Sequence, residues 1–217
     1  DAETIVFCGV HFMAEVAAIL SQPGQHVVIP DITAGCYLAD TADLPSVSAA
    51  WSHLSDVFDD VEQEITPITY VNSSAALKAF CGKHGGTVCT SSNAHKVIEW
   101  ALARRPRVLF FPDQHLARNT ALSMSIPREA QVLWDKNHPP AKRDLHAAKV
   151  ILWPGACNVH QRFRPHHVED VRARYPDIRV VVHPEANADV VALADEAGST
   201  AQIIRLIEES PSGSTWA

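Results

Sequence analysis

The sequence repeats one local pattern: a short apolar run, a turn of small or polar residues, and then apolar residues at helical spacing. Apolar runs rich in Val and Ile lie at residues 5–8, 26–29, 68–71, 87–89, 108–111, 150–153 and 180–182. Helical spacing follows at residues 12–20, 75–80, 94–102 and 202–209, and residues 47–58 predict a further helix. Continuous apolar strands that alternate with helices are typical of a parallel sheet covered on both faces. The predicted fold class is therefore α/β.

Composition and charge exclude several classes of protein and partner. With 47% hydrophobic and 20% charged residues, the chain is not expected to be disordered, collagen-like or a coiled coil. A formal net charge of −7 gives no general attraction to nucleic acid or to an anionic membrane. No apolar run approaches the ~20 residues of a spanning helix, and no signal segment precedes the first strand. We expect no nucleic-acid or membrane partner, and a cytoplasmic location.

Five cysteines are scattered along the chain without a CxxC pair, which is typical of reduced thiols and not of a disulfide framework. Cys36 and Cys157 each occur in a loop that contains a glycine and follows a predicted strand. Thiolates from separate loops can hold an iron–sulfur cluster or a zinc ion. The alternative for both positions is a buried, unreactive thiol, and this is the prediction for Cys8, Cys81 and Cys89.

Polar side chains follow the predicted strands, and in open parallel sheets ligands bind beyond the carboxyl ends of the strands. Tyr70 and Asn72 are two residues apart in an extended segment, so both side chains point to the same side. His183 and Glu185 are two apart around Pro184 and form a candidate acid–base or carboxylate-binding pair. These strand ends are the predicted location of the chemistry.

Ser91 and His160 lie at further strand ends, and Ser91 has a simpler alternative role. Together with Ser73, Ser74 and Ser92, it is a good helix N-cap. The 12 histidines are dispersed without an HExxH pair, so most are predicted to lie on the surface.

Ser199 and Thr200 follow Gly198 at the start of a predicted helix. Free backbone N–H groups and the positive end of the helix dipole at such a position suit a phosphate or a carboxylate. An ordinary Ser/Thr cap is an equally good explanation of these two residues.

Taken together and in order, these turns resemble those of quinolinate synthase. The resemblance rests on residues 5–15 (IVFCGVHFMAE), 30–36 (PDITAGC), 69–73 (TYVNS), 89–91 (CTS), 112–116 (PDQHL), 155–160 (GACNVH), 183–185 (HPE) and 198–200 (GST). It extends over essentially the whole chain.

The resemblance implies a pseudo-threefold arrangement of three-layer αβα units with parallel sheets around a 4Fe–4S cluster. One cysteine from each unit would hold the cluster. Residues 1–64 would be the remainder of the first unit plus a connector, residues 65–163 the second unit, and residues 164–217 an incomplete third unit. The family's third ligand cysteine lies beyond a segment like residues 215–217. We therefore expect a chain truncated at both ends, whose isolated fragment can lack activity.

The implied activity is that of a transferase of NAD biosynthesis. The family condenses iminoaspartate with dihydroxyacetone phosphate to quinolinate, releasing phosphate and water, with the cluster as a Lewis acid. L-aspartate oxidase or aspartate dehydrogenase is the implied functional partner.

The resemblance also implies roles for individual residues. Cys36 and Cys157 match cluster ligands, and catalytic roles are implied for Tyr70, His183 and Glu185, with Glu185 as the general acid–base. Substrate binding is implied for Tyr70, Asn72, Ser91, His160, His183, Glu185, Ser199 and Thr200. One departure is Ala186, where the family usually has a cysteine that is not one of these cluster ligands.

Two other functions stay open. The first is a non-catalytic α/β fragment that binds a small anion or dicarboxylate without a cluster, favoured by the lack of a third matching cysteine. The second is a zinc or redox-thiol protein that uses Cys36 and Cys157. This one is disfavoured, because the sequence has neither a CxxC pair nor a closed set of four ligands.

Overall fold

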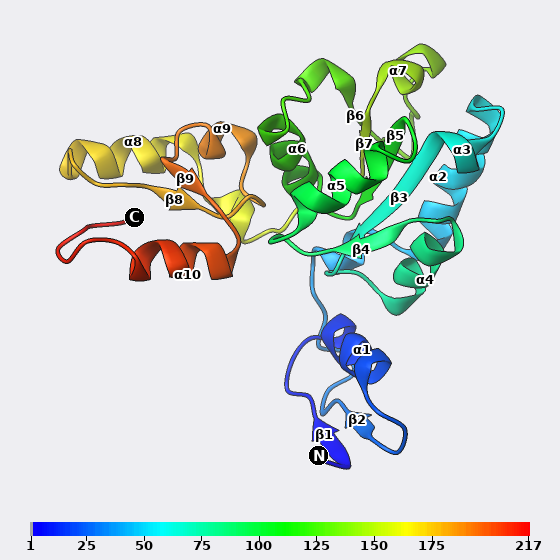
Figure 1. Cartoon of the computed structure of the whole chain (residues 1–217), viewed down its shortest axis with the longest axis horizontal. Coiled ribbons are helices and arrows are strands. Elements are labelled where there is room, and N and C mark those ends of the chain that lie inside the picture. Colours follow the sequence, from blue (N-terminus) through cyan, green and yellow to red (C-terminus); the bar gives the residue numbers. More distant parts are fainter. Residues whose placement is uncertain (1) are drawn as a thin grey trace.

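The computed structural model describes residues 2–217 and confirms the α/β class. Three sheets form, and within the described residues every pairing between their strands is parallel. Strands β1 (Thr4–Val6) and β2 (His26–Val28) pair with each other, as do β8 (Val181–Val182) and β9 (Glu196–Ala197). Figure 1 shows the largest sheet at the upper right, the body with β8 and β9 to its left, and the body with β1 and β2 below it.

The central sheet has five strands in the order β4-β3-β5-β7-β6. The strands are β3 (Ile65–Tyr70), β4 (Thr87–Cys89), β5 (Arg107–Phe111), β6 (Gln131–Leu133) and β7 (Val150–Leu152). The helices around it are α2 (Leu44–Val57), α3 (Val61–Glu64), α4 (Ala75–Lys83), α5 (Ala94–Leu102), α6 (Gln114–Ser123) and α7 (Lys142–Ala147). Helices α1 (His11–Leu20), α8 (Pro165–Arg174), α9 (Ala188–Val191) and α10 (Thr200–Glu208) belong to the smaller bodies. Short 3-10 turns occupy Ala39–Thr41, Arg128–Ala130 and His160–Arg162.

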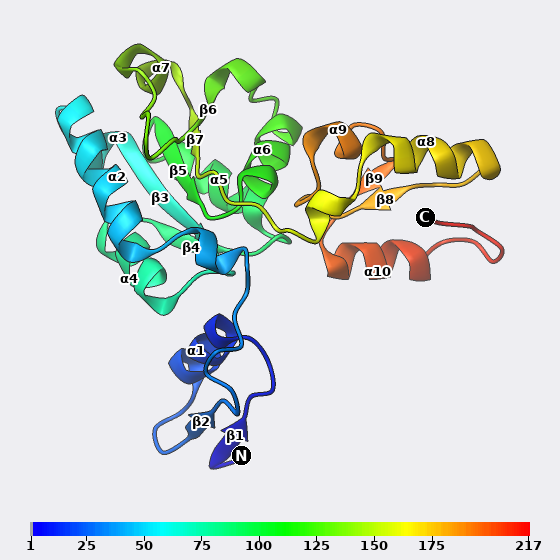
Figure 2. The same cartoon turned by 180° about the vertical axis from the view of Figure 1, so that it is seen from behind.

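Both faces of the central sheet are covered, because its strands alternate between two apolar cores. In β5, Leu109 and Phe111 pack in one core with side chains of α2, α4 and α7. Val108 and Phe110 pack in the other core with side chains of α5 and α6. All four are fully buried, which explains why the strand is a continuous apolar run. Figure 1 has α5 in front of the sheet, and Figure 2, from behind, has α2 in front.

The two strands that follow β3 in the sequence, β4 and β5, lie on opposite sides of it in the sheet. Helix α4 leads from β3 to β4 on one side of it, and α5 then leads from β4 back to β5 on the other side. The connections therefore diverge beyond the carboxyl ends of β3 and β5. This position is where open parallel sheets bind their ligands.

Most predicted elements are present with small shifts at their ends, but the sequence did not predict α3, α6, α7, α8, α9, β6 and β9. Residues 131–133 form a short strand at the sheet edge, in a region for which the sequence predicted no strand. Helix α6 buries Asn119 and Thr120 beside small alanines, so its buried face lacks the apolar spacing by which helices are recognised. No helix within residues 2–217 is both long enough and apolar enough to cross a bilayer.

The prediction of buried thiols is confirmed for Cys81 and Cys89, which have no exposed surface. It is wrong for Cys8, which is exposed. Cys8 follows β1, and β1 pairs with β2 in a two-stranded sheet that leaves Val6 61% exposed. An apolar run therefore predicts the strand correctly but overestimates its burial here.

Gly155, in the loop after β7, passes close to the backbone that follows β5. Its carbonyl accepts the Gln114 N–H at 2.9 Å, and the residue bridges to Asp113. A Cβ added at Gly155 would lie 2.4 Å from the carbonyl oxygen of Pro112 and 2.2 Å from the hydroxyl oxygen of Thr41. Because Gly155 has no side chain, the loop after β7 can pack directly against the end of β5.

We predict that Gly155→Ala lowers the free energy of unfolding by about 1–3 kcal/mol, because the Pro112 backbone has to move. The control is Gly82→Ala in α4, where an added Cβ meets nothing within 4 Å. That substitution is expected to raise the stability by about 0.5–1 kcal/mol, because it reduces the entropy of the unfolded chain. Urea unfolding measures both changes. Shifts of the same sign and size would contradict the prediction.

Candidate functional site

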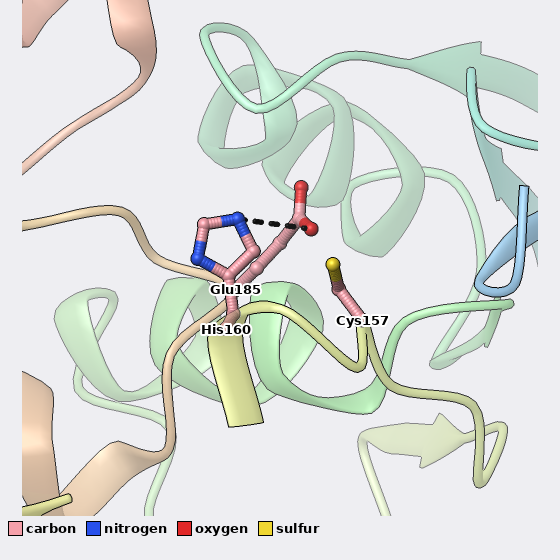
Figure 3. A group of neighbouring side chains, drawn as sticks. All are labelled: Cys157, His160 and Glu185. Carbon is pink, nitrogen blue, oxygen red and sulfur yellow. Dashed lines mark ion pairs between the residues drawn. The ribbon is translucent and has the colours of Figure 1, made fainter. Parts of the chain in front are cut away.

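Turns after several strands bring polar side chains together at one place. Tyr70 ends β3, Asp113 follows β5, Cys157 follows β7, and Glu185 follows β8. One ligand atom each from Cys157, His160 and Glu185 lies within 4.8 Å of the other two. Figure 3 shows these three side chains facing a common point. Among the described residues this is the one group of three whose chemistry suits a metal ion.

Glu185 lies at the centre of this group of polar side chains and is only 4% exposed. Its Oε1 accepts a hydrogen bond of 2.7 Å from the Tyr70 hydroxyl. Its Oε2 lies 3.6 Å from Nε2 of His160, the contact that is dashed in Figure 3. Its Oε1 also lies 3.7 Å from Nδ1 of His183. A carboxylate this buried needs such partners, because leaving it unpaired is costly.

The two histidines lie against each other beside this carboxylate. The rings of His160 and His183 stack with centroids 4.9 Å apart and an interplanar angle of 21°. Burial lowers the pKa of His183, and the neighbouring Glu185 charge only partly opposes this. The Glu185 backbone N–H donates to Nδ1 of His183 at 3.3 Å. Neutral His183 therefore accepts at Nδ1 and carries its proton on Nε2.

Tyr70 is held in its protonated form. Burial, and then the charge of Glu185, raise the pKa of its hydroxyl far above the ordinary value. A hydrogen bond with the Ser91 side chain opposes that rise, which places Ser91 beside the phenol. At neutral pH the Tyr70 hydroxyl thus keeps its proton and donates a hydrogen bond to Glu185.

Asp113 is a second carboxyl group at this edge of the sheet, in a turn that the sequence singled out without a role for this side chain. It is fully buried, and one carboxylate oxygen, Oδ1, caps α6 by accepting the Leu116 N–H at 2.7 Å. Burial raises its pKa to about 7, and the charge of Glu185 adds to the rise. Its Oδ2 has no hydrogen-bond partner within residues 2–217. The available sequence signal was its position just after Pro112 at the end of an apolar strand.

The remaining predicted residues lie near the same sheet edges without joining the contacts around Glu185. Asn72 follows β3 by two residues. Of the four serines proposed as caps, Ser74 does cap a helix, accepting the Leu77 N–H at 3.3 Å. Helix α5 instead begins after Asn93, so Ser91 does not cap it.

Ser199 takes the capping role that was one of its two predicted alternatives. Its Oγ accepts the Gln202 N–H at 3.4 Å, and the Gln202 side chain accepts the Ser199 N–H at 2.8 Å. The Gly198 N–H donates to the Val182 carbonyl at 3.0 Å, so Ser199 and His183 lie at the same edge of the β8–β9 sheet. Thr200 begins α10 and is exposed.

The cysteines differ in their capacity to act as thiolate ligands. Burial raises the pKa of the Cys81 and Cys89 thiols, which keeps them protonated. Cys36 and Cys157 are partly exposed and pack against the same apolar core. Cys157 belongs to the group with His160 and Glu185, whereas Cys36 lies outside that group and lines a separate cavity of about 300 Å³.

Comparison with known proteins identifies the family to which the chain belongs. A family model described as quinolinate synthetase A protein matches residues 1–217. The chain belongs to the quinolinate synthetase A family. Curated proteins named quinolinate synthase are 52% identical to it in Corynebacterium glutamicum, 53% in Acidobacterium capsulatum and 50% in Bacillus subtilis.

These three matches cover 100% of this chain. They cover 55% of the Corynebacterium glutamicum protein and 59% of the other two. The chain thus spans a little over half the length of these quinolinate synthases.

His115, the second residue of α6, gives this region a pH-dependent stability. Its pKa is lowered to about 4, first by burial and then by the charge of Arg118. In the unfolded chain a histidine has a pKa of about 6.5. The stabilising contribution of the neutral ring is therefore complete above pH ~6.5 and is lost as the pH falls through ~4, because the unfolded state binds the proton first.

We predict that His115→Gln removes about 1–3 kcal/mol of the stability loss between pH 7 and pH 4. Urea unfolding at a series of pH values measures this difference. The control is His95→Gln, at the second position of α5, where the side chain is exposed. An unchanged pH dependence in His115→Gln would show that this ring is not responsible.

Proposed function

We propose that this chain is part of a quinolinate synthase, which condenses iminoaspartate with dihydroxyacetone phosphate to quinolinate and releases phosphate and water. The family match over residues 1–217 supports the proposal. The observation that carries it is the meeting of Tyr70, His160 and Glu185 beside Cys157, because they come from separate turns that the family resemblance had singled out. A buried acid–base group next to a thiol suits the dehydration and ring closure that such a reaction needs.

We also propose that the three sheets are the cores of three α/β units in a pseudo-threefold arrangement, with boundaries near residues 64 and 163. In support, Cys36 follows β2, Cys157 follows β7, and Glu185 follows β8, so each sheet would supply a turn to one site. The helix of the predicted connector, α2, packs on the central sheet through Trp51 and Leu54. It would therefore contribute to the second unit.

The proposed cofactor is a 4Fe–4S cluster, with Cys36 and Cys157 among its ligands. Cluster irons prefer thiolates, and these two cysteines are partly exposed, whereas burial keeps Cys81 and Cys89 protonated. These two thiols would therefore supply part of the cluster's ligand set. When bound, a cluster with an iron that has no protein ligand supplies a Lewis acid that polarises a substrate hydroxyl or carboxylate.

Glu185 acts as the general acid–base in this proposal. The Tyr70 hydroxyl binds Oε1, which leaves Oε2, on the side of His160, as the oxygen that exchanges a proton with substrate. Tyr70 keeps its own proton because its pKa is raised, so it orients the carboxylate without competing for the transfer. Neutral His183 offers its Nε2–H as a hydrogen-bond donor to a substrate oxygen.

Substrate anions would be bound by donors that surround this group. Ser199 and Thr200 begin α10, whose backbone N–H groups favour a phosphate or a carboxylate. Asn72, Ser91 and His160 add amide, hydroxyl and imidazole donors for the substrate carboxylates. Because iminoaspartate is made by oxidising aspartate, L-aspartate oxidase or aspartate dehydrogenase is the proposed functional partner, in the cytoplasm.

We predict that Cys157→Ser lowers the iron and sulfide content of the anaerobically purified protein by more than about half, because a serine hydroxyl is a poor cluster ligand. The protein is produced from its complete gene for this measurement. Cys81→Ser is the control and should keep its iron, since Cys81 is fully buried away from the group. Equal iron in both variants would overturn the ligand assignment, and iron without sulfide would indicate a single metal ion.

We predict that Glu185→Gln lowers kcat for quinolinate formation about 10²–10⁴-fold, the usual contribution of a general acid–base. The amide keeps the shape of the side chain but cannot transfer the proton. Glu169→Gln is the control, because Glu169 is exposed on α8. Anaerobic assay of product measures both. Full activity in Glu185→Gln would remove Glu185 from the mechanism, and absence of product in the unmutated, cluster-loaded protein would refute the function.

A further inference from the structure

Asn119, on α6, contacts the turn that carries Glu185. Its Nδ2 donates to the carbonyl oxygen of Pro184 at 2.7 Å and to that of Ala186 at 2.8 Å. These two carbonyls lie on either side of Glu185 in the chain. Asn119 itself is only 7% exposed, so both hydrogen bonds are shielded from water.

The orientation of the Asn119 amide is fixed by its partners. Two carbonyl oxygens can only accept hydrogen bonds, so the NH₂ end has to face them. Both amide protons are then used, and Oδ1 has no hydrogen-bond partner in residues 2–217. A buried side chain that leaves its own oxygen unpaired in order to hold two backbone oxygens is specialised for that contact.

The turn is otherwise stabilised by short-range hydrogen bonds of its own. The Ala186 N–H donates to the His183 carbonyl at 3.0 Å, and the Glu185 N–H donates to the His183 ring. These bonds shape the turn but do not place it relative to the central sheet. Asn119 does, because α6 begins at Gln114, three residues after the end of β5, and packs against α9, which follows the turn. Figure 1 shows α6 and α9 facing each other between the central and the β8–β9 bodies.

We propose that Asn119 is a positioning residue that places the Glu185 carboxylate against the Tyr70 hydroxyl. It does so by binding the carbonyl groups of the residues before and after Glu185, Pro184 and Ala186, to a helix that covers the central sheet. This inference rests on the proposed function only for its effect on catalysis. Its effect on the turn can be measured independently of any activity.

The test compares Asn119→Ala with a matched control, Gln131→Ala. Gln131 is also a buried amide that donates to a backbone carbonyl, that of Ile126 at 2.9 Å, and leaves its own oxygen unpaired. It lies on β6, away from the Glu185 turn. Amide hydrogen exchange is measured by mass spectrometry over residues 183–188 of the complete protein. We expect faster exchange of this segment in Asn119→Ala than in Gln131→Ala, and equal exchange in both would overturn the proposal.

Kinetics then separate positioning from general stability. We expect Asn119→Ala to lower kcat about 10–100-fold, the usual cost of a small misplacement of a catalytic group, with little change in KM. In a Glu185→Gln background the same substitution should lower kcat by less than about 2-fold, because there is no acid–base group left to place. Independent, multiplying effects of the two substitutions would overturn the proposal.

Asn119→Ser, which keeps one hydroxyl donor, is the second variant and should lower kcat less than Asn119→Ala. If neither Asn119 variant folds while Gln131→Ala does, the residue serves the fold and the proposal is wrong. If the unmutated protein makes no quinolinate, the proposed function fails, but the exchange comparison still decides whether Asn119 holds the turn.

Discussion

A buried carboxylate is stable only when polar groups hydrogen-bond to it or lie close to it, and the polar side chains of the site surround Glu185. Glu185 is 4% exposed; its hydrogen-bond donor, the Tyr70 hydroxyl, comes from the central sheet, and the neighbouring rings of His160 and His183 come from later turns. The Tyr70 bond joins residues 115 apart in the sequence. Because an unpaired carboxylate here would cost several kcal/mol, folding and assembly of the site are the same event.

The central sheet supplies the fixed frame for this group. Its strands end together because all of them run parallel, and the loop after β7 is held to the end of β5 through Gly155 and Gln114. Asp113 lies at the same junction, and its pKa is raised to about 7, so it is largely neutral in mildly acidic solution. A neutral carboxyl group there adds no second full charge next to Glu185. The junction can therefore hold two carboxyl groups where two carboxylates would repel each other.

The fold class and most elements could be predicted, because a strand buried on both faces must be apolar throughout, as β5 is. Helix α6 could not be predicted, because its buried face includes the polar residue Asn119. That side chain is buried because it donates to the carbonyl of Pro184, 65 residues away in the sequence. Cys8 was predicted to be buried and is exposed, because an apolar run does not show whether another element covers the strand. Of the predicted site residues, Tyr70, Cys157, His160, His183 and Glu185 do come together, while their catalytic, binding and ligand roles stay predictions.

The sequence by itself determined the α/β class, the strand ends that carry polar side chains, and a resemblance strong enough to indicate the family. These properties are local, or are fixed by the order of short motifs. Only the tertiary structure decided that the Glu185 carboxylate lies against the Tyr70 hydroxyl and the rings of His160 and His183, and that Asn119 donates hydrogen bonds on both sides of Glu185. Burial, charge coupling and hydrogen bonds between distant segments exist only once the chain is packed, so no local pattern in the sequence encodes them.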